Sequence, residues 1–157
     1  MTIKIVKAEE KDVADIGKLG WEFMLFHQNI DPIFTPEYNS ASDFEGNQVR
    51  RFMQSDGGLA LVARDGIKVV GYSLSEIREP PPGFKREKYG YVDSMAVTAS
   101  YRRNGIGEKM LTEIMKWFQS KGINRVELGT AAQNIAANSF WQKQGFTIYR
   151  HAFYKEI

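Results

Sequence analysis

Residues 97–107, VTASYRRNGIG, lie between a predicted strand and a predicted long helix. The helix is indicated by a stripe of apolar residues at helical spacing: Ile106, Met110, Leu111, Ile114, Met115 and Phe118. Gly105 and Gly107 let the backbone come close to a ligand, and the first N–H groups of the helix point outward unpaired. Arg102 and Arg103 add two permanent charges that suit a phosphate. The stretch therefore predicts a pyrophosphate site; the alternative is an ordinary strand-to-helix turn with exposed arginines.

Other phosphate-binding motifs fit this turn poorly. A P-loop needs Lys followed by Ser or Thr directly after its last glycine, and neither Gly105 nor Gly107 has those neighbours. A dinucleotide-binding turn needs a third glycine where Met110 stands, and it belongs early in an alternating βαβ unit.

The remaining pattern predicts the element order β-α-α-β-β-β-α-β-α-β in a single domain covering residues 1–157. Strands are predicted over residues 3–6, 59–64, 68–77, 89–97, 126–128 and, as one or two closing strands, 146–155. Helices are predicted near residues 13–26, 43–54, 106–121 and 135–143. This order indicates an α/β (α+β) fold with a mixed sheet and parallel crossovers in its second half.

The composition excludes several kinds of site. The chain of 157 residues has no cysteine and two histidines, which excludes thiolate nucleophiles, disulfides and histidine-rich metal centres. A net charge of +2 is too balanced for a dedicated nucleic-acid-binding protein. No apolar run reaches the roughly 18 residues of a membrane span, and the charged N-terminus does not resemble a signal peptide. We expect a cytoplasmic domain that binds no metal, nucleic acid or membrane.

The charges are unevenly distributed. Residues 1–60 carry six basic and ten acidic side chains, a net of −4, whereas residues 61–157 carry fifteen and nine, a net of +6. This split suggests two sub-sites of opposite preference within one domain, or chance variation of the surface.

Two separate motifs resemble those of the GNAT superfamily of N-acetyltransferases. Arg102-x-x-Gly105-x-Gly107 resembles its signature for the pyrophosphate of acetyl-CoA. Residues 134–146 resemble a later segment with Asn, then Ala, then an aromatic residue, then Gly-Phe, here Asn134, Ala137, Phe140, Gly145 and Phe146. The spacing between the two motifs also agrees. The resemblance is close over residues 91–146 and loose over residues 1–90.

The resemblance implies a twisted, mostly antiparallel sheet whose fourth and fifth strands splay apart, flanked by about four helices. The acceptor side would comprise about residues 1–60, and the acetyl-CoA-binding core about residues 89–146. The exposed backbone of the fourth strand would pair with pantetheine, at Met95, Ala96 and Val97. The pyrophosphate would be held by Arg102, Arg103, Asn104, Gly105, Ile106 and Gly107. Asn134 and Asn138 would contact the pantetheine arm, and Lys143 would approach the nucleotide phosphate.

The resemblance also directs attention to Asp93, where many relatives carry Glu or Asp. By alternation, Asp93, Met95 and Val97 share one strand face, and the carboxylate would deprotonate or orient the acceptor amine. The alternative is a solvated or salt-bridged strand residue. Many relatives have a Tyr acid where this chain has Trp141, whose indole is not a usable acid. Trp141 then packs around or shields the thioester.

Three hydroxyl groups are alternative acids to the missing tyrosine: Tyr101, Ser139 and Tyr154. In the absence of any of them, CoA thiolate is a reasonable leaving group without an acid. Backbone N–H near Val97 is the expected oxyanion donor.

The acceptor is expected to contact residues 20–45, a stretch that contains Trp21, Glu22, Phe26, His27, Asp31, Phe34, Glu37 and Tyr38. Aromatic and carboxylate groups together suit a cationic amine, such as a polyamine, an amino-sugar, an amino acid or a peptide N-terminus. His27 is also read as an ordinary surface histidine. The alternatives to a small-molecule enzyme are a protein N-acetyltransferase and a non-catalytic acyl-CoA-binding regulatory module. A homodimer through residues 151–157 is a further expectation.

Overall fold

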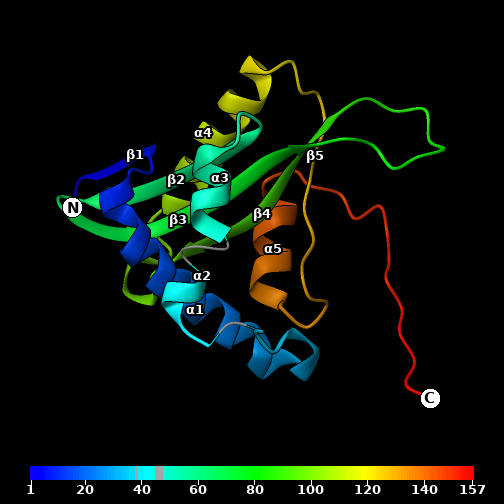
Figure 1. Ribbon diagram of the computed structural model, residues 1–157, viewed down its shortest axis with the longest axis horizontal. Coiled ribbons are helices and arrows are strands. Elements are labelled where there is room, and N and C mark those ends of the chain that lie inside the picture. Colours follow the sequence, from blue (N-terminus) through cyan, green and yellow to red (C-terminus); the bar gives the residue numbers. More distant parts are fainter. Residues whose placement is uncertain (38, 45–47) are drawn as a thin grey trace.

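The computed structural model describes residues 1–37, 39–44 and 48–157, built around a five-stranded sheet (Figure 1). The strands lie side by side in chain order: β1 (Ile3–Lys7), β2 (Gly58–Asp65), β3 (Lys68–Arg78), β4 (Tyr89–Val97) and β5 (Val126–Glu127). Neighbours are antiparallel except β4 and β5, which are parallel and are connected through α4 (Ile106–Ser120). The predicted mixed, mostly antiparallel sheet is confirmed.

Helices cover both faces of this sheet. The face here called the α1 face carries α1 (Val13–Ile30), α2 (Ala41–Phe44) and α3 (Arg50–Gln54), and the α4 face carries α4 (Figure 1). On the α1 face, the buried core includes Val13, Ile16, Phe52, Val62, Tyr72 and Leu74. On the α4 face, it includes Leu59, Leu61, Val92, Ile106, Met110, Ile114 and Phe118. The last helix is α5 (Ile135–Lys143), and 3₁₀ turns cover Glu10–Asp12, Pro32–Phe34 and Ala99–Tyr101.

One predicted element differs from the structure. The helix predicted over residues 43–54 is helical wherever it is described, at 43–44 in α2 and at 48–54 through α3, and residues 45–47 lie outside the described residues. The closing strands predicted over residues 146–155 are wrong, because residues 146–157 have no regular secondary structure, and the C-terminal part of this segment runs away from the body (Figure 1). Alternating apolar residues indicate strand propensity, but a strand also needs a paired neighbour, which the sequence pattern cannot supply.

A β-bulge in β4 changes which way its side chains point. Leu74 pairs with Ser94 but the next residue of β3, Ser75, pairs with Val92, so Asp93 is an extra residue in β4. Met95 packs in the core of the α4 face. The carboxylate of Asp93, by contrast, lies on the α1 face, 3.7 Å from Arg78. The expectation that Asp93 shares a face with Met95 and Val97 is therefore wrong, because the bulge interrupts the alternation.

No helix in the described ranges 1–37, 39–44 and 48–157 is both long enough and apolar enough to span a bilayer.

Candidate functional site

The loop before α4 contains two residues in the left-handed backbone region. Arg103 and Gly105 have positive φ angles of 62° and 73°, on either side of Asn104. Such alternation turns successive N–H groups toward one side and creates a hollow that binds anions. A positive φ is strained for arginine, and strained backbone gathers at functional sites. The Asn104 amide fixes the loop by donating to the carbonyls of Tyr101 (3.2 Å) and Arg102 (3.1 Å).

The N-terminus of α4 adds backbone donors next to this loop. Lys109 N–H donates to Gly105 O (3.0 Å), so the N–H groups of Ile106, Gly107 and Glu108 come before the first helical hydrogen bond. These groups lie at the positive end of the helix dipole, where anions bind. The Ile106 side chain is buried, so this residue offers a ligand only its backbone.

The two glycines of the motif serve different purposes. A Cβ at Gly105 would meet open space, so its positive φ is what requires glycine there. A Cβ at Gly107 would lie 3.2 Å from the Phe140 ring, so this glycine lets α5 pack tightly against the start of α4. The sequence motif had suggested only the approach of a ligand.

β4 and β5 are paired only at their first residues, and the stretch beyond, where the facing backbone of β4 has no partner strand among the described residues, is here called the opening. The two strands pair only at Gly90 with Val126 and at Tyr91 with Glu127, which confirms the predicted splay. Thr98 N–H donates to Val70 O (2.8 Å). The neighbouring residues Gly71 and Val97 therefore form a non-hydrogen-bonded pair, and the N–H and C=O groups of Val97 point away from β3.

By this alternation, the backbone groups of Val97 and Met95 face the opening, whereas those of Ala96 pair with β3. Arg102 Nε donates to the carbonyl of Val97 (2.9 Å). This bond ties the phosphate loop to the end of β4, so the predicted pyrophosphate and pantetheine segments are adjacent.

The two predicted asparagines have local roles at α5. Asn134 is the N-cap, and its side chain accepts a hydrogen bond from Ala137 N–H (3.2 Å). The Asn138 amide donates to the carbonyls of Ala131 (3.3 Å) and Ala132 (3.2 Å), and its oxygen accepts from Thr130. Asn138 thus holds the segment that follows β5. The predicted contacts of both residues with pantetheine stay predictions.

Trp141 is a packing residue of α5. It is half-buried against the α4-face core, and its ring meets Phe140 and Phe146 at centroid distances of 5.0 and 5.2 Å. Lys143, the last residue of α5, is exposed, and its predicted contact with a nucleotide phosphate stays a prediction.

Asp93 belongs to a cluster of charged groups on the α1 face. Arg78 Nη2 lies 3.7 Å from the Asp93 carboxylate and 2.7 Å from that of Glu76. The guanidinium also stacks over the Tyr91 ring, 3.5 Å from its centroid. Arg51 of α3 donates to Glu76 from the other side (3.2 Å). The cluster therefore contains two carboxylates and two guanidinium groups.

The pKa of Asp93 is raised above its ordinary value. Partial burial raises it most and the charge of Glu76 raises it further, while Arg78 and Arg51 act in the opposite direction. A carboxylate with a raised pKa is a better general base near neutral pH than an ordinary aspartate. The interpretation of Asp93 as a salt-bridged residue and its interpretation as a base are thus compatible.

The three charged neighbours of Asp93 were not among the site residues predicted from the sequence. A signal was present, because Glu76 and Arg78 alternate at the end of an otherwise apolar strand and so share one face. Arg51 gave no such signal, since only the docking of α3 on the sheet brings it to Glu76.

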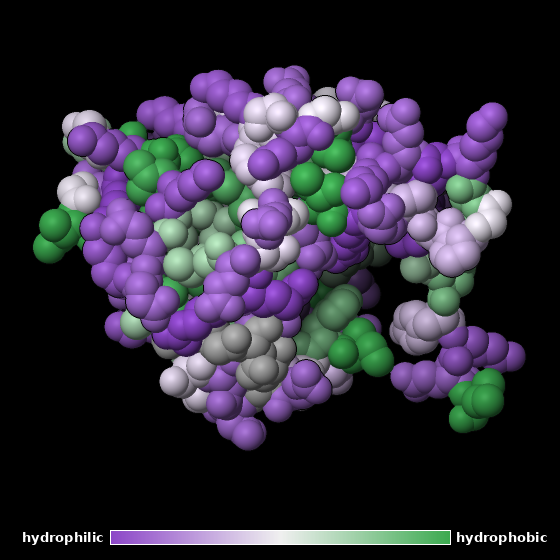
Figure 2. Space-filling view, turned by 45° about the horizontal axis from the view of Figure 1, so that its top comes forward, coloured by the Kyte–Doolittle hydropathy of each residue, from purple (hydrophilic) through white to green (hydrophobic). Residues whose placement is uncertain are grey.

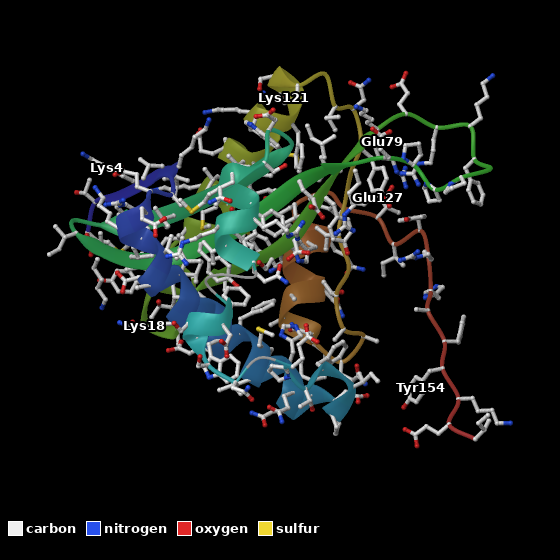
Figure 3. All side chains as sticks on the ribbon, viewed as in Figure 1. Lys4, Lys18, Glu79, Lys121, Glu127 and Tyr154 are labelled. Carbon is white, nitrogen blue, oxygen red and sulfur yellow. The ribbon has the colours of Figure 1, made fainter. Side chains whose placement is uncertain are left out.

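The three alternative hydroxyl groups lie apart from this cluster. Tyr101 donates to Asp65 (3.0 Å) in the β2–β3 hairpin, and that hydrogen bond raises the pKa of the phenol. Tyr154 lies far out on the terminal segment, as Figure 3 shows, and is highly exposed. Ser139 is exposed on α5.

The predicted acceptor stretch forms an aromatic cluster at the end of α1. The His27 ring packs on the rings of Phe23, Phe26 and Phe34, at centroid distances of 4.3, 5.4 and 5.9 Å. The His27 Nδ1–H donates a hydrogen bond to the carbonyl of Phe23 (2.9 Å). Phe26 and Phe34 remain substantially exposed, and Figure 2 shows apolar patches set among the polar surface. Tyr38 lies outside the described residues.

Several acidic groups of the first third are already paired within the chain. Asp12 is buried and receives Arg64 Nη2 at 2.6 Å, while Glu10 pairs with Arg50 at 2.7 Å. Asp31 accepts from Ile33 N–H (2.9 Å) at a helix start. These acids have partners within the chain, so they are not all available to bind a cationic ligand.

Glu127 connects three segments at the start of the opening (Figure 3). This buried carboxylate of β5 accepts from Tyr149 (2.5 Å), Arg125 (2.8 Å) and Arg86. Burial alone would raise the pKa of Glu127, but these hydrogen bonds lower it to about 2. The carboxylate therefore anchors the β3–β4 loop and the terminal segment to the sheet edge.

Within residues 1–37, 39–44 and 48–157, no group of three or more His, Asp or Glu side chains could hold a metal ion.

Comparison with known proteins agrees with this geometry. The mycothiol acetyltransferase of Amycolatopsis mediterranei is 26% identical over 109 residues, 69% of this chain and 36% of that protein. The chain thus spans about a third of the length of that relative. The BH1408 protein of Bacillus halodurans, solved as a tetramutant, has the same fold at 19% identity and a TM-score of 0.84, with full coverage of both chains.

A second solved structure is the aminoglycoside acetyltransferase AAC(6')-Iy in complex with a bisubstrate analogue of CoA. Its TM-score is 0.77 at 16% identity, and the match covers 100% of this chain and 99% of that one. The model of the acetyltransferase (GNAT) family matches residues 24–146, which include the phosphate loop, the opening and α5. The chain therefore belongs to the GNAT acetyltransferase family.

Proposed function

We propose that the protein is an acetyl-CoA-dependent N-acetyltransferase that transfers acetyl directly to a primary amine of a small cationic metabolite. The observation that carries this proposal is the opening between β4 and β5. The phosphate loop lies at the α4 end of the opening, and the bulged Asp93 faces the other side of the sheet. Donor and acceptor would therefore approach the reaction centre from opposite faces.

The donor side follows from the backbone. Acetyl-CoA supplies an activated acyl group as a thioester. Residues 102–107 and the first turn of α4 would bind its pyrophosphate through N–H groups and through the guanidinium groups of Arg102 and Arg103. The outward-facing groups of Met95 and Val97 would pair with the pantetheine amides. Asn138 would act by holding the far wall of the opening.

The acceptor side depends on Asp93. An ammonium group must lose a proton before its nitrogen can attack, and Asp93 would take that proton directly or through a water molecule. A backbone N–H of β4 near Val97 that the pantetheine amides do not use would stabilise the developing oxyanion. Because the chain has no cysteine, an acyl-cysteine route is excluded, and direct attack of the amine on the thioester is the route that we propose.

The leaving thiolate would depart without a dedicated acid. The Trp141 indole N–H is a hydrogen-bond donor but does not ionise at working pH. Its contacts with Phe140 and Phe146 support a role as a wall of the thioester pocket.

The test measures acetyl transfer to a panel of amines. Transfer is detected as thiol release from acetyl-CoA, and the product is identified by mass spectrometry. Amine-dependent thiol release with an acetylated product is expected. Binding of acetyl-CoA without transfer to any amine would instead favour a regulatory module, and transfer only to peptides would favour a peptide N-acetyltransferase. Failure to bind acetyl-CoA at all would refute the proposal.

We also propose that about residues 1–60 form the acceptor side and about residues 89–146 form the donor side.

Residues 151–157 would pair with a second copy of the chain, since Phe153, Tyr154 and Ile157 are highly exposed on a segment without a partner strand in the described chain. Light scattering of the full chain against a truncation after Arg150 tests this. A monomer in both cases would contradict it.

A further inference from the structure

We propose that the preferred acceptor carries an anionic group, such as a carboxylate, close to its reactive amine, and that Arg51 binds this group. This inference deepens the proposed function and rests on it. It starts from the charges around Asp93, which are not those of a simple cation site.

The charge cluster is electrically balanced. Asp93 and Glu76 contribute two negative charges, while Arg51 and Arg78 contribute two positive ones. A polyamine would gain little from such a site, because each guanidinium repels it about as strongly as each carboxylate attracts it. A molecule with one ammonium group and one anionic group matches the pattern of charges without needing an excess of either sign.

Arg78 is committed to the protein. Its Nε and Nη2 both donate to Glu76 (2.8 and 2.7 Å), and its guanidinium is stacked on Tyr91. Only about a third of its side chain is exposed. Arg78 therefore positions the Asp93 carboxylate and is poorly placed to receive a ligand.

Arg51 is less committed, although its guanidinium also lies over an aromatic ring, 4.3 Å from the centroid of Phe52. The Arg51 side chain is 52% exposed, and in the described chain its hydrogen bonding is a single contact from Nη1 to Glu76. Four of its five N–H donors thus remain for other partners, and guanidinium groups bind carboxylates and phosphates through two parallel hydrogen bonds. Arg51 is connected to Asp93 through Glu76 and Arg78: Arg51 lies 3.2 Å from Glu76, Arg78 lies 2.7 Å from Glu76, and Arg78 lies 3.7 Å from Asp93.

The geometry thus assigns two recognition points to the acceptor, the amine at Asp93 and the anionic group at Arg51. Glu76 stands between them and holds both guanidinium groups, so it sets their spacing. An amine that carries its acid a few bonds away can reach both points at once. Amino acids and small phosphorylated amines belong to this class.

The experiment compares acceptors that differ only in the anionic group. Suitable pairs are lysine with 1,5-diaminopentane, ornithine with 1,4-diaminobutane, and phosphoethanolamine with ethanolamine. Thiol release from acetyl-CoA gives kcat and KM for each member with the wild type and Arg51→Gln. Arg50→Gln is the matched control, because the adjacent Arg50 pairs with Glu10 instead.

We expect the acid-bearing member of at least one pair to have a kcat/KM at least about tenfold higher, the scale of one charge-assisted contact. Arg51→Gln should remove that preference by raising KM for this member alone, and Arg50→Gln should preserve it. Equal rates within every pair, or an equal effect of Arg51→Gln on both members, would overturn the inference while leaving the acetyltransferase function intact.

If no amine of the panel is acetylated, the same pairs are compared by saturation-transfer NMR on the complex with CoA. Selective binding of the acid-bearing member that is lost in Arg51→Gln supports the inference, and its absence overturns it. Failure of the protein to bind acetyl-CoA in calorimetry would count against the proposed function itself.

Discussion

Asp93 and Met95 are two residues apart on β4, yet their side chains lie on opposite faces of the sheet. The bulge at Asp93 causes this, and it brings the carboxylate within 3.7 Å of Arg78 while Met95 packs beneath α4. The same short segment therefore serves both sides of the site. Its outward backbone faces the opening, and its bulged carboxylate lies in the charge cluster that includes Arg51 of α3.

Removing the charge of Glu76 should lower the pKa of Asp93. Burial raises this pKa most, and Glu76 raises it further, so Glu76→Gln leaves the carboxylate easier to ionise. The acidic limb of kcat/KM against pH should move to lower pH, because that limb reports the free base. Arg78→Met should move the limb in the opposite direction. An unchanged limb in both variants would argue against Asp93 as the base.

Relief of strain at Arg103 should separate stability from ligand binding. Arg103→Gly removes a side chain from a φ of 62°, which should stabilise the fold by about 1 kcal/mol. The same variant should weaken acetyl-CoA binding about tenfold or more, because a charge-assisted contact of about 1.5–3 kcal/mol is lost. Denaturation and calorimetry measure the two effects, and Arg103→Lys is the control that keeps both strain and charge. Unchanged affinity in Arg103→Gly would show that the loop is purely structural.

Trp141→Tyr should retain or raise turnover. The substitution keeps an aromatic wall against Phe140 and Phe146 and adds a hydroxyl that can ionise. Trp117→Tyr in helix α4 is the control for the general effect of replacing a half-buried tryptophan. A collapse of activity in Trp141→Tyr with an intact fold would contradict the packing role.

Glu127 should make stability depend on pH in the acidic range. Its pKa is about 2 in the folded protein against an ordinary value of 4.5, so the folded state binds its proton less readily than the unfolded state. The resulting stabilisation is complete above pH 4.5 and is lost as the pH falls toward 2. Urea denaturation of the wild type and Glu127→Gln should show a stability difference that shrinks over this range. A difference that stays constant with pH would rule out the ionised carboxylate as the anchor.

The sequence was sufficient for the parts of the site that depend on local backbone. Glycines and arginines precede an amphipathic helix, so the turn that contains Arg102 and Gly105 could be placed between a strand and a helix, whereas its binding of pyrophosphate stays a prediction. The same holds for the order of the strands and for the splay implied by the family resemblance.

Tertiary pairing accounts for what the sequence missed. The bulge at Asp93 exists only through its register with β3, and Arg51 reaches Glu76 only because α3 docks on the sheet. The closing strands failed for the same reason, since an alternating pattern does not determine whether an edge is available to pair with.

The most direct test of the account compares the wild type with Asp93→Asn in the steady state, using acetyl-CoA and the best amine of the panel. We predict a loss of kcat/KM of about 10²–10⁴, as for removal of a general base, with acetyl-CoA affinity unchanged in calorimetry. Raising the pH deprotonates more of the amine and should therefore recover part, but not all, of the lost kcat/KM. Amine-dependent thiol release at the wild-type rate in Asp93→Asn would contradict the account.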